Sequence, residues 1–388
     1  VAGNTVLGES ALDASVSGGN NTALGKSCCT ALTSGASNVG VGMNSLLSLT
    51  TGSDNVAIGS GALETITTQT ANTAVGDRAL RANEASNNTA VGYFALDANT
   101  TGTENIAVGS EALKANTTAS GNIAMGYSAL AVNTTGANNT AIGGNALDAN
   151  TTASNNTAVG NQALGANTTG AQNVAVGTSS LDANTTGDDN VAIGKGSLTD
   201  NTTGSNNVAV GLVALGDNTT ADNNTAVGYH ALRLNTTGVD NTAVGAFALD
   251  ANTTGNDCVA VGKQALTDNT TGINNTALGF QSLENNTTSN NNTAVGYESM
   301  AANTTGHQNV AVGANALDAN TTGDLSVAIG YNSLGDNTTG GNNVAVGNGA
   351  LLKNTTASNN TAVGLSALTS NTTGAENTVS GQAAMSVN

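Results

Sequence analysis

The sequence predicts an all-β protein, a β-solenoid (β-roll or β-helix) of 23 coils with a repeat length of seventeen residues per coil. Two observations predict this fold class. A short segment ending in glycine, typified by Asn-Thr-Ala-Val-Gly, recurs along the whole chain, and 21 of the 22 steps between successive glycines have this same length. Repeats built from helix pairs take roughly 30 residues or more, so this repeat is too short for them. The repeat covers residues 1–388, and a single repeat domain is therefore expected.

We number each repeat from its glycine as position 1. These glycines run from Gly8 to Gly381, and the one short step, which lacks a single residue, lies between Gly76 and Gly92. The consensus is Gly-x-x-Ala-Leu-x-x-Asn-Thr-Thr-Gly-x-x-Asn-(Thr/Val)-Ala-(Val/Ile). Positions 14–17 are rich in β-branched and small apolar residues, which indicates a short strand that ends in a turn. Glycine at position 1 is expected where φ is positive or where another backbone comes close.

The remaining positions complete the coil. Positions 3–7, around Ala-Leu, predict a second short strand or extended segment, and Asn-Thr-Thr-Gly at positions 8–11 predicts the other corner. Leu at position 5 and the aliphatic residue at position 17 are expected to fill the coil interior. Asn side chains at positions 8 and 14 are expected to form hydrogen-bonded ladders along the stack. With coils about 4.8 Å apart, 23 of them would form a rod on the order of 110 Å long.

The predicted strand has two different faces. Because side chains alternate along a strand, positions 15 and 17 share one face and position 16 lies on the other. Neither face carries a charge in any repeat, so both faces are expected to be buried. One face can pack inside the coil, whereas the other needs the opposite wall of a flat coil or another chain. A single-chain solenoid and a lateral homo-oligomer, such as a trimer around an axis, both remain open.

Composition excludes several classes of function. Aromatic residues make up 2% of the chain, charged residues 9%, and Trp and Pro are missing, which argues against the large core of a conventional enzyme. The chain has eight Lys and Arg against 26 Asp and Glu, and it has no basic cluster. Nucleic acid and anionic membranes are therefore not expected partners. The longest aliphatic stretches, such as residues 208–215, are too short to span a bilayer.

No catalytic, cofactor-binding or metal-binding residues are predicted. His230 at position 3 and His307 at position 12 lie four repeats apart, which excludes a metal pair or a catalytic dyad. Cys28 and Cys29 stand where Ala and Leu are usual and are expected to act as small apolar fillers. Cys258 replaces a ladder Asn without an evident reason. The scattered acidic side chains are expected to be solvated rather than to bind calcium; at position 6 they include Asp13, Asp97, Asp148, Asp182, Asp250 and Asp318, and Asp200 and Asp217 form one neighbouring pair at position 7.

Aromatic residues gather at position 2, a pattern that fits simple corner packing or an adhesive, carbohydrate-binding stripe. The residues are Tyr93, Tyr127, Tyr229, Phe280, Tyr297 and Tyr331.

The Asn-Thr-Thr corner occurs in 17 repeats and has three interpretations. It predicts a structural Asn ladder, it matches the N-glycosylation sequon in every copy, and its stacked Thr columns at positions 9 and 10 resemble the Thr arrays of ice-binding solenoids. Ice-binding faces carry their Thr residues on a flat strand, whereas this pair adjoins a Gly turn. Ice binding is therefore kept as an alternative function.

The strand and the turn after it resemble a known family. The segments Asn88 to Leu96 and Asn224 to Leu232, which read Asn-Thr-Ala-Val-Gly-x-x-Ala-Leu, are similar to the left-handed β-roll heads of trimeric autotransporter adhesins. They also resemble shaft repeats of bacteriophage tail fibres. The resemblance implies a non-enzymatic extracellular fibre for attachment or reach, at a cell surface or on a virion, and it brings no catalytic residues. This repeat is longer than that of the adhesin heads because of its Asn-Thr-Thr-Gly corner.

The register of the repeat predicts self-association along the stack. Val1 falls at position 11 and Asn388 at position 8, so the 23 turns nearly close on their own register. Head-to-tail stacking into a filament is expected, with a segment cut from a longer fibre as the alternative. The predicted function is thus that of a secreted structural protein, a stiff rod that assembles with itself and contacts a cell surface or glycan.

Overall fold

A computed structural model describes residues 3–386 of the chain. Within that range the chain forms 23 short strands and no helix, which confirms the predicted parallel β-solenoid with about seventeen residues per turn. The chain divides into two compact units, Val1–Asn190 and Val191–Asn388, and each unit is a stack of coils. Val1 and Asn388, whose register predicted head-to-tail stacking, lie outside the described residues.

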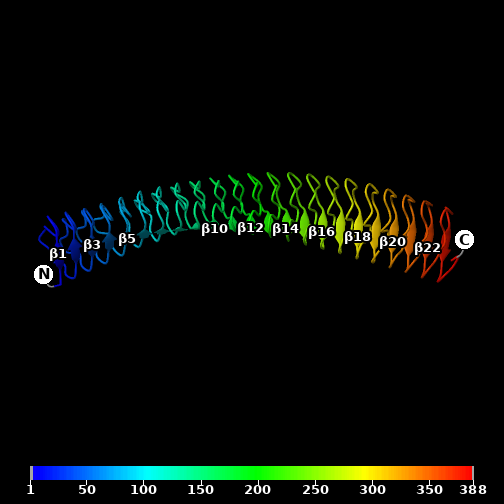
Figure 1. Cartoon of the computed structure of the whole chain (residues 1–388), viewed down its shortest axis with the longest axis horizontal. Helices are drawn as coiled ribbons and strands as arrows, with labels where there is room; N and C mark the ends of the chain where they lie inside the picture. The colour runs from blue at the N-terminus through cyan, green and yellow to red at the C-terminus, as the bar shows by residue number, and fades with distance from the viewer. Residues whose placement is uncertain (1–2, 387–388) are drawn as a thin grey trace. The chain divides into compact units, whose positions relative to one another are not determined.

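The first unit contains eleven strands, which lie side by side along one edge of its coils (Figure 1). Each strand pairs in parallel with the strand one coil away, so that Ala158 lies opposite Ala175. The strands are β1 (Thr5–Leu7), β2 (Thr22–Leu24), β3 (Val39–Val41), β4 (Val56–Ile58), β5 (Thr73–Val75), β6 (Thr89–Val91), β7 (Ile106–Val108), β8 (Ile123–Met125), β9 (Thr140–Ile142), β10 (Thr157–Val159) and β11 (Val174–Val176).

The second unit contains twelve strands with the same parallel pairing, in which Ala209 lies opposite Ala226. The strands are β12 (Val191–Ile193), β13 (Val208–Val210), β14 (Thr225–Val227), β15 (Thr242–Val244), β16 (Val259–Val261), β17 (Thr276–Leu278), β18 (Thr293–Val295), β19 (Val310–Val312), β20 (Val327–Ile329), β21 (Val344–Val346), β22 (Thr361–Val363) and β23 (Thr378–Ser380). In both units every paired residue therefore faces the same position of the repeat.

Each strand ends at the position-1 glycine, and the structure confirms why glycine is needed there. Gly143, for example, has a φ of +138°, a conformation that side chains of L-residues rarely adopt. A Cβ at this position would also collide with the carbonyl group of Gly160 in the next coil. The backbones of adjacent coils thus come into contact at this column of glycines.

The second strand predicted for positions 3–7 is wrong. The segment is a turn in which positions 3 and 5 are left-handed, as in Ser128 (φ 53°) and Leu130 (φ 52°). This alternation still directs backbone groups at the neighbouring coils: the Ser128 N–H donates to the Ser110 carbonyl and the Leu130 N–H donates to the Ala146 carbonyl, both at 3.0 Å. The hydrogen-bonded ladder therefore continues around the corner without an extended backbone.

The core differs from the prediction in one respect. Position 16 and the Ala-Leu pair at positions 4 and 5 are buried, as Ala90, Ala95 and Leu96 illustrate. The aliphatic side chain at position 17 does not fill the interior, because it shares the outward strand face with position 15; Val91 is 37% exposed while its neighbour Ala90 is fully buried. The expectation that both faces of the strand are buried is therefore wrong for a single chain.

Two amide ladders satisfy the polar groups of this thin core, as predicted. At position 14, the Asn139 N–H donates to the Asn122 Oδ1 and the Asn139 Nδ2 donates to the Ala153 carbonyl, both at 2.9 Å. At position 8, the Asn150 Nδ2 donates to the Asn133 Oδ1 at 2.9 Å and to the Ala153 carbonyl at 3.1 Å. In both ladders the Asn residue is thus hydrogen-bonded to the Asn of the neighbouring coil, through its backbone N–H at position 14 and its side-chain Nδ2 at position 8, and also to a backbone carbonyl.

The position-8 ladder starts only at Asn83. In the three preceding coils the same corner is filled by Leu32, Leu49 and Ile66, all fully buried, and in the first coil it is the exposed Ser15. The change coincides with the short coil, whose missing residue falls at this corner. Strands β5 and β6 on either side of the short step keep their register, so the deletion is absorbed entirely in the turn.

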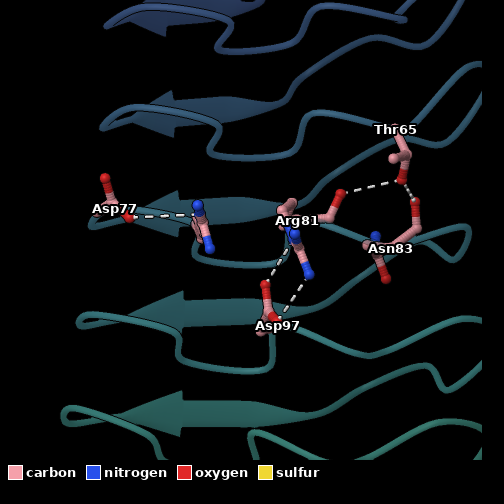
Figure 2. Close-up of polar contacts among 6 residues, drawn as sticks. Thr65, Asp77, Arg81, Asn83 and Asp97 are labelled. Atoms are coloured by element: carbon pink, nitrogen blue, oxygen red, sulfur yellow. Dashed lines mark hydrogen bonds and ion pairs between the residues drawn. The ribbon is translucent and has the colours of Figure 1, made fainter.

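Side chains at the variable positions link the short coil to its neighbours (Figure 2). The Thr65 hydroxyl donates to the Arg81 carbonyl at 3.0 Å and to the Asn83 carbonyl at 3.4 Å. The Arg81 guanidinium in turn makes two hydrogen bonds, of 2.9 and 3.1 Å, to the Asp97 carboxylate of the following coil. Such a bidentate pair fixes the geometry between coils more than a single contact would.

Replacing the glycine of position 1 is expected to be far more damaging than replacing its neighbour. Gly143→Ala combines a positive φ with an overlap against the next coil and should lower the free energy of unfolding by at least about 3 kcal/mol. The Cβ added by Gly144→Ala meets only the flexible Asn161 side chain, and this substitution should change the free energy of unfolding by less than about 1 kcal/mol. Urea unfolding of both variants measures the difference, and equal losses would contradict the close contact of the coils.

Candidate functional surfaces

The outward face of the strands forms an uncharged surface, which we call the strand-face stripe and define as positions 15 and 17 of all coils. Position 15 is Thr, Val or Ile and is half-buried in most coils, whereas the position-17 side chains are more exposed. Twelve of the latter are 36–46% exposed: Ile58, Val91, Val108, Met125, Ile142, Ile193, Val227, Val244, Leu278, Val312, Ile329 and Val363. The stripe thus presents regularly spaced methyl groups to solvent in both units.

The Thr columns at positions 9 and 10 lie on a bend rather than on a strand. The position-9 hydroxyls are engaged within the stack, as when the Thr100 Oγ1 donates to the Thr117 carbonyl at 2.9 Å. The position-10 side chains, such as Thr101, are exposed. Ice binding by these columns stays a prediction, and measurement of thermal hysteresis tests it.

The Asn residues of the Asn-Thr-Thr sequons are buried in all 17 copies. Their Nδ2 atoms are the donors of the position-8 ladder, so a glycan on one of them would break the ladder and could not be housed in the coil. Sequence reasoning missed a second set of sequons, Asn-Asn-Thr starting at position 13, although the string was visible. Their first Asn is exposed in each case: Asn20, Asn87, Asn138, Asn155, Asn223, Asn274, Asn291 and Asn359.

The tyrosines at position 2 are exposed, and several contact other rings. The Tyr229 ring stacks on the His230 ring with centroids 3.9 Å apart, and the Phe247 ring meets both rings edge-on. The Phe280 and Tyr297 rings stack with centroids 5.5 Å apart. These contacts explain part of the aromatic pattern as corner packing, but they leave the tyrosines 44–62% exposed.

The two histidines lie apart and take part in local contacts. His230 stacks on Tyr229, while the Nδ1 atom of His307 accepts the Asn290 N–H at 2.9 Å. Within residues 3–386 no three His, Cys, Asp or Glu side chains come close enough together to hold a metal ion, and no pocket is found. The same residues include no helix that is long and apolar enough to cross a membrane.

A two-coil period, which sequence reasoning missed, runs along position 12. In alternate coils this position is Ser, Asp or Asn, and its side chain accepts the N–H of position 12 in the preceding coil at 2.6–3.1 Å. His307 adds one such bond in a coil between two of these, because its Nδ1 accepts the Asn290 N–H. The acceptors are Ser53, Ser86, Ser120, Ser154, Asp188, Asp222, Asn256, Asn290, Asp324 and Ser358. The recurrence of these residues in every second repeat was the available signal. It groups the coils in pairs, except where Asn290, His307 and Asp324 accept in successive coils.

The position-6 carboxylates also avoid adjacent coils, and burial affects some of them. Asp148 and Asp182 lie on either side of Gly165, and a Cβ on that glycine would approach a carboxylate oxygen of each, at 3.6 and 2.7 Å. Burial raises the pKa of both groups, and the charge on Asp182 adds to the rise at Asp148. Burial also raises the pKa of Asp318, to about 6. These acids are therefore less solvated than the sequence suggested.

All three cysteines are buried and free. Cys28 and Cys29 act as the expected fillers, with their Sγ atoms 3.6 Å apart. Cys258 occupies the position-14 ladder: its N–H donates to the Asn241 Oδ1 at 3.0 Å and its Sγ donates to the Gly272 carbonyl at 3.3 Å. Burial raises the pKa of the Cys258 thiol to about 11. The thiol therefore imitates the donor of the missing Asn but not its strong acceptor.

The sequence matches no protein-family model, and no curated protein matches it. The resemblance to adhesin heads and tail-fibre shafts thus rests on the repeat motif, with which the parallel solenoid is consistent.

Restoring asparagine at position 258 is expected to stabilise the protein. Cys258→Asn supplies the Oδ1 acceptor that the other ladder residues offer to the next coil, and should raise the free energy of unfolding by about 1 kcal/mol. Ser326→Asn is the matched control, since the Ser326 hydroxyl already accepts the Asn343 N–H at 3.3 Å and the gain should be smaller. Thermal unfolding ranks the two variants, and a loss of stability in Cys258→Asn would contradict the ladder account.

Neutralising Asp318 is expected to stabilise the protein in a pH-dependent way. Because its pKa is higher folded than unfolded, its proton favours the folded state, a contribution that is present at low pH and lost as the pH rises through about 6. Asp318→Asn should therefore add about 1 kcal/mol at about pH 7.5, after discounting for solvent screening, and little at about pH 4. Thermal unfolding at both pH values is the measurement. The exposed Asp13→Asn serves as control, and an equal gain from Asp318→Asn at both pH values would exclude burial as the cause.

Proposed function

We propose that this chain is a non-enzymatic structural protein that associates with copies of itself through the strand-face stripe and serves in an extracellular fibre or filament for attachment. The observation that carries the proposal is the alternation of burial along every strand. Position 16 is enclosed by its own coil, while the equally uncharged positions 15 and 17 remain half-buried or exposed. A surface of this kind is what an interface between chains requires.

The charge distribution supports association at this face rather than elsewhere. The chain carries a net charge of −18, so copies of it repel one another wherever their acidic positions meet. Positions 15 and 17 carry no charge in any repeat, and contact along them avoids this repulsion. Burial of their methyl groups supplies the driving force.

The size of the stripe indicates how such an interface works. With coils about 4.8 Å apart and two residues covering about 7 Å of strand, each coil contributes a footprint of roughly 30 Å². A stable interface buries about 800 Å² per partner, and 23 such footprints amount to roughly 700 Å², so association needs practically every repeat. This requirement accounts for uncharged residues at both positions in every coil.

The same architecture supports a mechanical role. Backbone hydrogen bonds link each coil to the next at the strand, at the turn and at the corner, and two Asn ladders reinforce them. Cleavage by a protease requires a local segment to leave this ladder, which is costly where every neighbour is bonded. A stiff, protease-resistant spacer is the function that such a stack supports best.

Charged substitutions on the stripe are expected to dissociate the assembly. Val227→Glu combined with Val244→Glu places two charges at position 17 of adjacent coils and should weaken self-association at least about tenfold, because unpaired charges would be buried in the interface. Asn206→Glu combined with Asn223→Glu adds the same charge at the exposed position 13 and should leave it intact. Sedimentation velocity over a range of concentrations measures both variants.

A wild-type chain that sediments as a monomer at every concentration would overturn the proposal. Where the wild type self-associates, electron microscopy resolves the mode of assembly. Discrete rods several chains thick would support lateral association alone, while filaments with an axial repeat of about 110 Å would support the predicted head-to-tail stacking.

A further inference from the structure

We propose that the tyrosines at position 2 form two binding sites for extended, neutral, β-linked glycans, one site in each unit. Each site consists of two exposed tyrosines two coils apart, with a small residue between them. The inference rests on the proposed attachment function and assigns the class of surface that is bound.

The site in the second unit is formed by Tyr297 and Tyr331, which are 52% and 55% exposed. Ala314 occupies the same position in the coil between them, so position 2 places only a methyl group between the two rings. Two coil steps separate the tyrosines by about 9.6 Å. The stacked Phe280 ring supports Tyr297 from the preceding coil, with centroids 5.5 Å apart.

The first unit repeats this arrangement with different neighbours. Tyr93 and Tyr127 are 52% and 62% exposed, and the small Ser110 lies between them. The Tyr93 ring meets the Phe94 ring edge-on with centroids 4.3 Å apart, which holds it in place as Phe280 holds Tyr297. Two independent occurrences of the pattern Tyr, small residue, Tyr argue that the spacing matters more than the aromatic content alone.

The spacing follows the two-coil period of the fold. All five tyrosines belong to coils that donate the position-12 N–H, so they lie an even number of coils apart; the Tyr297 coil also accepts such a bond, through His307. A separation of about 9.6 Å is comparable with the length of one disaccharide in an extended β-1,4-linked glycan. Two tyrosines so placed meet sugar rings of the same orientation, because alternate sugars in such a chain face the same way.

The chemistry around the rings fits a sugar better than a purely apolar partner. The C–H face of a pyranose packs on the negatively polarised face of an aromatic ring, while its hydroxyl groups need hydrogen-bond partners at the edge. Position 3 supplies them beside the second-unit site, where Glu298, Asn315 and Asn332 follow one another in successive coils.

The charge of the surroundings selects among glycans. At the first-unit site the Glu111 carboxylate is paired with the Lys114 ammonium at 3.3 Å, whereas Glu298 adjoins the second-unit site and the chain as a whole carries a net charge of −18. The Glu298 carboxylate and the net charge disfavour anionic polysaccharides and leave neutral ones as the expected ligands. An α-1,4-linked chain coils and cannot place successive equivalent sugars on rings this far apart along a straight column.

The test is titration of the full-length protein with cellohexaose and chitohexaose, and with maltohexaose as the α-linked comparison. Calorimetry and tyrosine fluorescence measure the binding. The expected result is binding of at least one β-linked hexasaccharide and none of maltohexaose. The fourfold variant Tyr93→Ala, Tyr127→Ala, Tyr297→Ala and Tyr331→Ala should lose at least about tenfold in affinity, because both stacking platforms are removed. Tyr229→Ala, whose neighbours two coils away at position 2 are lysines, should bind as the wild type does.

A second variant separates spacing from mere aromatic stickiness. Ser110→Tyr with Tyr127→Ser, combined with Ala314→Tyr and Tyr331→Ala, keeps the number of tyrosines at position 2 unchanged but moves the two of each site to adjacent coils. The proposal expects this variant to bind as weakly as the fourfold alanine variant. Undiminished binding by it, or failure of the wild type to bind either β-linked hexasaccharide, would overturn the proposal.

Sedimentation of the same variants keeps this result distinct from the self-association proposal. Position 2 lies outside the strand-face stripe, so all of these variants should assemble as the wild type does. Loss of glycan binding with intact assembly supports the sites, whereas intact assembly without any wild-type binding rejects the sites alone.

Discussion

Equivalent residues of successive coils must lie directly above one another at the spacing of a parallel sheet, and the other features of the fold depend on that condition. At about 4.8 Å, a residue with a Cβ cannot replace the position-1 glycine, because the next carbonyl occupies the space. The same distance is ideal for an amide to bond with the identical amide above it, as Asn150 does with Asn133. One spacing thus excludes side chains from one column and favours asparagine in two others.

This constraint explains why the coil can be stable with so little core. A coil encloses little more than one Leu and two Ala, far less apolar volume than a globular domain buries. Its stability comes instead from backbone bonds made to the coils above and below, including those of the left-handed turn residues such as Leu130. The arrangement satisfies the interior but leaves the outward strand face without a partner, so the fold itself creates the surface that self-association would bury.

The sequence was sufficient to predict the solenoid, the length of its coil, the glycine turn and both ladders, because each leaves a recurrent residue in the repeat. The sequence was insufficient to predict the conformation where two arrangements of the chain are compatible with the same residue types. Val91 and Ala90 are both apolar, and pattern alone did not show which of them faces inward; the small interior selects Ala. Ser128 and Leu130 have ordinary propensities, so their left-handed conformation follows from the stacking of the coils rather than from the residues themselves. The alternation at position 12 was visible but was averaged away by a consensus of single coils.

The alternation has a consequence for recognition that a strictly uniform stack would not have. A solenoid with one residue type at each position offers a partner only the repeat of a single coil, about 4.8 Å, which is shorter than most molecular building blocks. Pairing the coils through acceptors such as Ser120 and Ser358 doubles that repeat. Side chains placed in every second coil, as Tyr297 and Tyr331 are, then lie at a distance that a sugar polymer can match. The hydrogen bonds that pair the coils would in this way set the spacing of the binding surface.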